Sequence, residues 1–263
     1  MMARPDLKEL KNVATILFDD GYKDNIGYAA PILAKYKAKA SFYVVTESID
    51  KNIPTWTHIL EYCFQYTKKT DINLIFNFLP IDLQVTELST EGKRIEYVKK
   101  LKPFLKTISH QNRNMILDRV RQSFNDVDLP RIMMDWQDLL KLTEQGHYIG
   151  SHTVSHCMLG TMSDPDEIRN ELLISGQMIE KHLGYFPKTI SYPVGSYSQT
   201  VINLSKEVGY TIGLAVKQRP YYPAKDDIFE IPRIELYNEN WFKTKLRITN
   251  ILEDIKAITR YNR

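Results

Sequence analysis

The sequence predicts an α/β protein in which parallel strands alternate with helices. Residues 13–20 (VATILFDD) form an apolar run that ends in two carboxylates, which is typical of a strand buried on both faces. Residues 40–45 (ASFYVV) are rich in aromatic and β-branched side chains, which favour strands. Apolar residues at helical spacing between and after these runs indicate βαβ units, and therefore a parallel sheet or barrel.

The other predicted elements follow the same alternation along the chain. Further strands are expected at residues 147–151, 189–194, 210–216 and 231–236. Helices are expected at residues 25–36, 135–145, 166–183, 198–208 and 239–258. The end of the helix at 166–183 is marked by Gly184, because glycine is favoured just after helix C-termini. His182 is therefore interpreted as a structural residue of the last helical turn.

Residues 54–128 interrupt this alternation. The segment is polar, mostly helical in period, and contains no clear strand. We predict a single domain over residues 1–263, with residues 54–128 as a helical insertion after the second strand. In a barrel of parallel strands, the rim with the strand-to-helix loops also carries the chemistry. We expect the insertion on that rim, where it would shape access to the site and the choice of substrate.

Composition restricts the function classes. A net charge of +3 is nearly balanced and does not favour a nucleic-acid partner. The chain has no run of about 18 apolar residues, so no membrane span is expected. The N-terminus lacks the apolar stretch of a secretory signal, which favours a cytoplasmic protein, although a chain already trimmed of its signal would look the same. Cys63 and Cys157 stand far apart and outside any CxxC pattern, so we expect no disulfide.

Two adjacent carboxylates, Asp19 and Asp20, end the first predicted strand. Burying charge there is unfavourable unless a cation or hydrogen-bond donors interact with it. Successive side chains of a strand diverge, so the two carboxylates can have different tasks. Gly21 allows a sharp turn of the backbone directly after them. The alternative interpretation is a helix N-cap followed by an acid in the first turn.

Two histidines, His152 and His156, follow the strand predicted at residues 147–151. If the segment turns helically, residues at i and i+4 share a face, as in HExxH helices that present two imidazoles to zinc. With one carboxylate they make three protein ligands, the number in catalytic zinc sites that keep a position for water. A lone histidine is more often structural, but this pair at this spacing favours a metal site.

These motifs resemble the polysaccharide deacetylase family, the NodB-homology enzymes of carbohydrate esterase family 4. The resemblance lies in Phe18-Asp19-Asp20-Gly21, in His152-Thr153-Val154-Ser155-His156, and in Ser191-Tyr192-Pro193-Val194-Gly195. It covers roughly residues 13–47 and 131–236 and leaves the insertion unmatched. It implies a distorted (β/α)7 barrel that binds one divalent metal, usually zinc. It also implies removal of acetyl groups from N-acetylated sugars or from acetylated polysaccharide.

The resemblance implies a role for each matching residue. Asp19 matches the family's general base, and Asp20, His152 and His156 match its metal ligands. The backbone N–H of Val194 matches the donor to the developing oxyanion, so the valine side chain is no obstacle.

The sequence departs from the family pattern at the group that braces the base. Many members have an arginine where this chain has Ser191, which is too short and uncharged for the task. Arg233 is the best replacement, because Ile234 and Leu236 alternate toward one face and direct Arg233 to the other. We predict that Arg233 donates to Asp19, directly or through one water. The alternative is an ordinary surface pair with Glu235 or an exposed charge at a strand edge.

A second departure concerns the general acid. The family's aspartate–tryptophan motif and its Leu-x-His, which supplies the acid, are not evident, so the acid stays unassigned. His147 is expected at the far end of its strand and is interpreted as structural. His58 and His110 lie in the insertion, from which they can reach the rim.

Aromatic and basic residues complete the predictions. Tyr192, Tyr197 and Trp56 are candidates for stacking on sugar rings, with core packing as the alternative, and Trp136 is expected in the core. Basic residues of the insertion are expected to form a solvated face, with peripheral membrane or diphosphate contact as the alternative. They are Lys99, Lys100, Lys102, Arg119 and Arg121.

The motifs favour a metal-dependent hydrolase that removes acetyl groups from a glycan, a lipid-linked sugar or a small amino sugar. The alternative is a catalytically idle relative that binds carbohydrate or a partner protein, because the arginine and the acid are missing from their usual positions. The presence of all four polar residues, Asp19, Asp20, His152 and His156, favours the enzyme.

Overall fold

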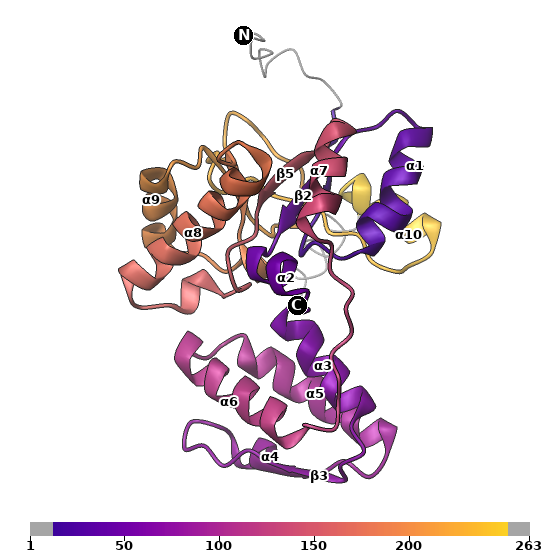
Figure 1. Cartoon of the computed structure of the whole chain (residues 1–263), viewed down its shortest axis with the longest axis vertical. Helices are drawn as coiled ribbons and strands as arrows, with labels where there is room; N and C mark the ends of the chain where they lie inside the picture. The colour runs from indigo at the N-terminus through magenta and orange to yellow at the C-terminus, as the bar shows by residue number, and fades with distance from the viewer. Residues whose placement is uncertain (1–12, 252–263) are drawn as a thin grey trace.

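The computed structural model describes residues 13–251 and contains a parallel sheet flanked by helices (Figure 1). Five strands run in the order β1-β2-β5-β6-β7, and every neighbouring pair is parallel. They are β1 (Ile16–Phe18), β2 (Ala40–Val44), β5 (Tyr148–Ser151), β6 (Thr189–Ser191) and β7 (Ile212–Leu214). The sheet is curled into a half-barrel, which confirms the predicted α/β class and its barrel-like parallel sheet.

Helices follow the strands and cover the sheet, as the alternating pattern predicts. One core cluster packs Phe42 of β2 against Leu33 and Leu139, and another packs Ile190 of β6 against Leu172. Burial of these apolar side chains stabilises each helix against the sheet. The covering helices are η1 (Asn25–Ala29), α1 (Ala30–Lys35), α7 (Trp136–Glu144), α8 (Pro165–Leu183) and α9 (Gln199–Val208), and short 3₁₀ turns are η2 (Leu159–Thr161) and η3 (Pro193–Gly195).

Local residues fix the ends of the helices beside the site. α7 begins after Asp135, which forms a reciprocal capping box with Asp138. α8 begins after Asp164, whose carboxylate accepts from the backbone N–H of Asp166. It ends as predicted at Gly184, which adopts a left-handed φ of 79°. His182 stacks on Trp136 with ring centroids 4.1 Å apart, and its structural role is confirmed.

The insertion forms a lobe of its own beside the sheet (Figure 1). It follows α2 (Thr46–Lys51) and has its own apolar core, which includes Leu60, Leu101 and Ile116. The expectation that it contains no strand is wrong, since β3 and β4 pair antiparallel. Each has only three residues, too few to show a strand period. The elements are α3 (Trp56–Tyr66), β3 (Asp71–Asn73), α4 (Ile81–Gln84), β4 (Val85–Glu87), α5 (Glu91–Leu105) and α6 (His110–Ser123).

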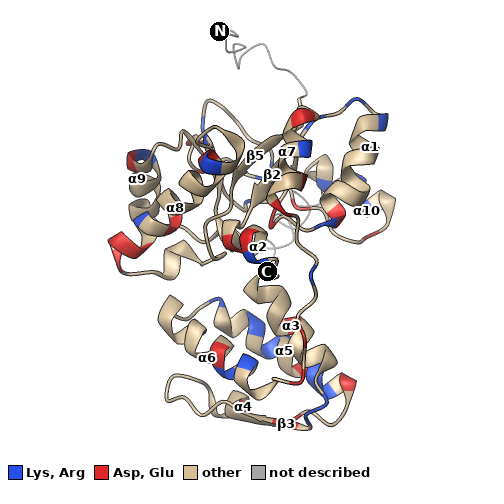
Figure 2. Cartoon of the chain, in the orientation of Figure 1, with Lys and Arg blue, Asp and Glu red and all other residues tan. Residues whose placement is uncertain are grey.

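Basic residues mark the helices of the insertion (Figure 2). Lys100 pairs with Glu96 at 3.1 Å, and Lys102 pairs with Glu61 at 2.7 Å. The side chains of Lys99 and Arg119 are exposed. These four residues agree with the expected solvated face, but Arg121 does not, because it is half-buried and its guanidinium donates to Cys63 Sγ and to the Val127 carbonyl oxygen. Contact with a membrane stays a prediction.

The C-terminal part differs from the sequence prediction. Residues 231–236 do not form a strand, because only Ile231 makes a bridge, to Leu214. Pro232 lacks the N–H that would continue the ladder. The helix expected at 239–258 is present as α10 (Trp241–Ile248), and residues 252–258 lie outside the described range. Within residues 13–251, no helix combines the length and apolar character needed to cross a membrane.

Candidate metal centre and active site

The predicted polar residues meet at the carboxyl edge of the parallel sheet. Asp19 and Asp20 follow β1, His152 follows β5, and Val194 follows β6. Because β1, β2, β5 and β6 are parallel neighbours in the sheet, these strand ends lie on one edge. Loops at this edge are where parallel α/β proteins place their chemistry.

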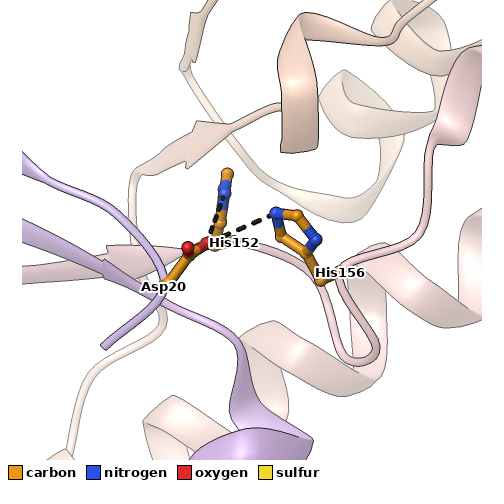
Figure 3. A group of neighbouring side chains, drawn as sticks. All are labelled: Asp20, His152 and His156. Atoms are coloured by element: carbon orange, nitrogen blue, oxygen red, sulfur yellow. Dashed lines mark ion pairs between the residues drawn. The ribbon is translucent and has the colours of Figure 1, made fainter. Parts of the chain in front are cut away.

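Asp20, His152 and His156 form a compact group of metal-ligand type (Figure 3). The Asp20 Oδ1 atom lies 3.5 Å from His152 Nε2 and 3.3 Å from His156 Nε2. Tetrahedral zinc with bonds of about 2.0–2.1 Å places its ligand atoms roughly 3.3 Å apart. The donor set and its spacing therefore fit a zinc ion with an open coordination position.

The two imidazoles are in the state that binds metals. The Nδ1 atom of His152 lies 2.7 Å from the carbonyl oxygen of Ser191, so Nδ1 donates and Nε2 keeps its lone pair for a metal. Burial lowers the pKa of His152, and it lowers the pKa of His156 to about 4. Both rings are therefore neutral near pH 7, the form that binds metals.

The backbone around the site is held in conformations that non-glycine residues rarely adopt. Asp20, Thr153, His156 and Val194 have φ values of 73°, 66°, 56° and 56°. Left-handed residues of this kind cost about 1–3 kcal/mol each and persist where the surroundings over-determine them. Thr153 and Val194 are β-branched, for which this region is least favourable. The strain is concentrated in the loops that carry the ligands and the predicted oxyanion donor.

Asp19 is braced by an arginine, as predicted from the sequence. The Nη1 atom of Arg233 donates to both carboxylate oxygens of Asp19, at 3.0 and 2.8 Å. Its Nε atom donates to the carbonyl oxygen of Ala215 at 3.3 Å, which fixes the guanidinium plane. The hydroxyl of Ser191 also donates to Asp19 Oδ2, at 3.3 Å, so this uncharged residue adds one hydrogen bond while Arg233 supplies the charge.

The pKa values of the two adjacent carboxylates are shifted in opposite directions. Burial would raise the pKa of Asp19, but interaction with the His152 imidazole, the charge and hydrogen bonds of Arg233, and the Ser191 hydroxyl together hold that pKa below its usual value. Burial and the nearby charge of Asp19 raise the pKa of Asp20 to about 6. Asp19 is thus ready to accept a proton, whereas Asp20 would be stabilised as a carboxylate by a cation bound beside it.

Removing the brace is expected to lower turnover without removing the metal. Arg233→Ala should reduce kcat about 10–100-fold, the range for lost outer-sphere partners. Arg233→Lys should recover little, because one ammonium cannot hold both Ala215 and Asp19 in the arginine geometry. Zinc content and acetate release measure the two effects. Arg219→Ala is the matched control, since Arg219 pairs with Asp226 instead, and a wild-type rate in Arg233→Ala would contradict the role.

The predicted sugar-stacking residues differ in accessibility. Tyr192 is fully buried in the core, so no ring face is open to a sugar and this prediction is wrong. Trp56 is 8% exposed, and its indole N–H donates to the carbonyl oxygen of His156 at 3.1 Å. It therefore supports the metal loop, and its stacking role is also contradicted. Tyr197 is half-buried, with one face on Tyr192 and its hydroxyl donating to Glu230, and its sugar contact stays a prediction.

The insertion adjoins this site. Trp56 reaches His156 from α3, and the hydroxyl of Tyr22 lies 3.2 Å from that of Thr55. Val194 packs against the core of the insertion. The insertion therefore lies at the edge where the site is, as expected, and its influence on substrate choice stays a prediction.

Other histidines have separate roles. His147 is buried near the amino end of β5, where its Nδ1 accepts from the backbone N–H of Ala40 at 3.2 Å, which confirms it as structural. His110 Nδ1 lies 2.9 Å from a guanidinium nitrogen of Arg113. The ring of His58 lies 5.7 Å from that of Tyr22. No described contact assigns a general acid.

Sequence reasoning missed two supports of the metal loop. One is the indole hydrogen bond of Trp56, and the other is Glu171 of α8, which accepts from Val154 and Ser155. Neither residue has a motif or spacing that links it to the histidines, so the sequence offers no signal for them. Cys157, beside the loop, is a buried free thiol whose pKa is raised by burial and by Glu171.

Known proteins share this sequence pattern and fold. Over 72 residues the chain is 31% identical to a peptidoglycan-N-acetylglucosamine deacetylase of Bacillus cereus, a match that covers 27% of this chain and 26% of that protein. It is 21% identical to YxkH of Bacillus subtilis over 217 residues, or 82% of this chain and 49% of that protein. The chain therefore matches half or less of the length of these relatives.

The solved structures and the family pattern agree with these matches. The Streptococcus pyogenes deacetylase PplD in complex with acetate has the same fold, with a TM-score of 0.54 at 18% identity, covering 87% of this chain and 66% of that one. A sequence model of the family described as polysaccharide deacetylase matches residues 7–213, most of the chain. The chain belongs to the polysaccharide deacetylase family.

Proposed function

We propose that this protein is a metal-dependent hydrolase, with zinc as its metal, that removes acetyl groups from N-acetylated sugar units. The proposal rests on one observation: a group of metal-ligand residues and a separate carboxylate base lie together at the carboxyl edge of the sheet. Asp20, His152 and His156 are spaced as zinc ligands, and a separate carboxylate, Asp19, is braced by Arg233. A base next to three ligands with an open position is the arrangement that hydrolysis needs.

Each residue of the site has a separate role in the proposed reaction. Asp20, His152 and His156 would hold a divalent metal, which would polarise the acetamide oxygen and lower the pKa of a water when bound. Asp19, kept ionised by Arg233, takes a proton as the water oxygen bonds to the acetyl carbon. The N–H of Val194, in its left-handed turn, is the proposed donor to the oxyanion. The proton taken by Asp19 then passes to the amide nitrogen, directly or through water, as the carbon–nitrogen bond breaks, which releases acetate and a free amine.

The relatives favour a glycan substrate. The Bacillus cereus relative is named for peptidoglycan N-acetylglucosamine, and this chain shares 31% identity with it over a segment only. We therefore take N-acetylglucosamine units of a glycan as the first substrate class to test. A lipid-linked sugar and a small amino sugar are the other classes of the same chemistry.

Acetate release tests the proposal. Zinc-loaded protein should release acetate and leave free amines on oligomers of N-acetylglucosamine, on a lipid-linked acetamido sugar, or on the free sugar. The preferred member of this panel identifies the substrate class. Zinc-loaded protein that binds these sugars without releasing acetate would contradict the proposal and favour the idle carbohydrate-binding alternative.

A further inference from the structure

The loop between the two metal-ligand histidines has no regular secondary structure of its own. It runs from His152 to His156 and contains two left-handed residues, Thr153 and His156. The Nε2 atoms of the two histidines must keep a fixed distance to bind one ion. The contacts that hold this loop therefore decide how well the ligands are positioned.

Backbone groups of α2 and a side chain of the insertion hold the carbonyl oxygens of this loop. The N–H of Thr46 donates to the Thr153 oxygen at 3.2 Å, and that of Glu47 donates to the Val154 oxygen at 3.0 Å. The indole of Trp56 donates to the His156 oxygen. These donors leave the N–H groups of the loop to be satisfied by other partners.

One side chain, Glu171 of α8, accepts from the middle of the loop. Its Oε2 atom accepts from the backbone N–H groups of Val154 at 2.9 Å and Ser155 at 3.0 Å. Its Oε1 atom accepts from the hydroxyl of Ser155 at 2.7 Å. Hydrogen bonds to a charged acceptor are roughly twice as strong as neutral ones, so this carboxylate is a strong anchor.

We propose that Glu171 is a positioning residue for the metal site. By fixing the turn at Val154 and Ser155, it holds His152 and His156 in the geometry that binds the metal. It does not bind the ion, since the group of ligand atoms comprises Asp20, His152 and His156. The inference rests on the metal site of the proposed function. Loss of such outer-sphere partners lowers metal affinity 10–100-fold in other sites.

A pocket next to the loop allows the effect of Glu171 on metal binding to be measured apart from its effect on folded stability. It has a volume of about 230 Å³, and Val154, Glu171, Glu167 and His110 are among its lining residues. A water occupies about 30 Å³, so waters can enter and satisfy the loop N–H groups if Glu171 is truncated. Truncation should therefore change the folded stability little, while the fixed geometry of the turn is lost.

The test measures zinc affinity by chelator competition in Glu171→Ala, Glu171→Gln and Glu167→Ala. Glu167 is the control because it is exposed and lines the same pocket on the same helix. Glu171→Ala should bind zinc about 10–100-fold more weakly than wild type, with the melting temperature of the metal-free protein nearly unchanged. Glu171→Gln should lie between, since its amide oxygen still accepts, and Glu167→Ala should match wild type. Excess zinc should restore the turnover of Glu171→Ala.

Three outcomes would overturn the inference. Wild-type zinc affinity in Glu171→Ala would show that the carboxylate does not position the ligands. A weaker affinity accompanied by an equal loss in Glu167→Ala would show a general effect of charge on this helix. If Glu171→Ala does not fold, Ser155→Ala removes only the 2.7 Å hydroxyl contact, and unchanged affinity there and in Glu171→Gln would likewise contradict the role. Absence of zinc binding in wild type would instead show that the proposed metal function is wrong.

Discussion

Replacing Asp19 with asparagine is expected to reduce kcat about 100- to 10,000-fold, the contribution of a positioned general base. The amide has the same shape as the carboxylate but cannot accept the proton of the attacking water. Zinc should stay bound, because Asp19 is not one of the three grouped ligands. Acetate release and zinc content, measured on the same preparation, separate these two expectations.

Ser191→Ala is the matched control for this change. It removes a donor at 3.3 Å, the longest of the described hydrogen bonds to the Asp19 carboxylate, and leaves the carboxylate and Arg233 in place. We expect a fall of about tenfold, because a hydrogen bond to a charged group contributes about 1.5–3 kcal/mol and this long one lies at the lower end. Near-normal turnover in Asp19→Asn would show that another group is the base.

Replacing His156 with alanine is expected to remove most of the bound zinc and, with it, the activity. The change leaves two of three protein ligands, and the Nε2 of His156 is the ligand atom nearest to Asp20 at 3.3 Å. Elemental analysis after dialysis measures the occupancy. The free energy of metal binding depends on ligand number, so the loss should persist at moderate excess zinc.

His147→Gln is the control for this substitution. His147 is also a buried histidine next to β5, but its contact is with the backbone of Ala40 at the other end of the strand. The substitution should lower the free energy of unfolding by about 1–3 kcal/mol, the effect of an altered buried hydrogen bond. Zinc occupancy should stay full. Equal loss of zinc in both variants would show that the effect of His156 is indirect.

Much of the fold and of the site was predictable because the evidence is local in sequence. The apolar run that leads to Asp19 and the run that precedes His152 both have strand composition. Parallel strands bring their carboxyl ends to the same edge of the sheet. The contact of Arg233 with Asp19 was predicted by the same reasoning, since a buried carboxylate without its usual partner requires another cation.

Other features depend on tertiary contacts that no local pattern encodes. Tyr192 follows a strand that leads to the site, yet its side chain enters the core beside Tyr197. Trp56 turns its indole to the metal loop because the insertion docks there. Glu171 lies on an ordinary amphipathic helix, and only the packing of α8 on β5 brings it under the loop. Alternation predicts which face a residue occupies but not which partner it meets.

Reversible removal of the metal shows whether this protein needs zinc for hydrolysis. The protein is dialysed against a chelator, assayed for acetate release from N-acetylglucosamine oligomers, and assayed again after zinc is added back. We expect about one zinc per chain in the wild-type protein. Its activity should be lost when the metal is removed and should return when zinc is added, whereas His156→Ala should not recover. Full activity in protein stripped of metal would contradict the proposed metal dependence.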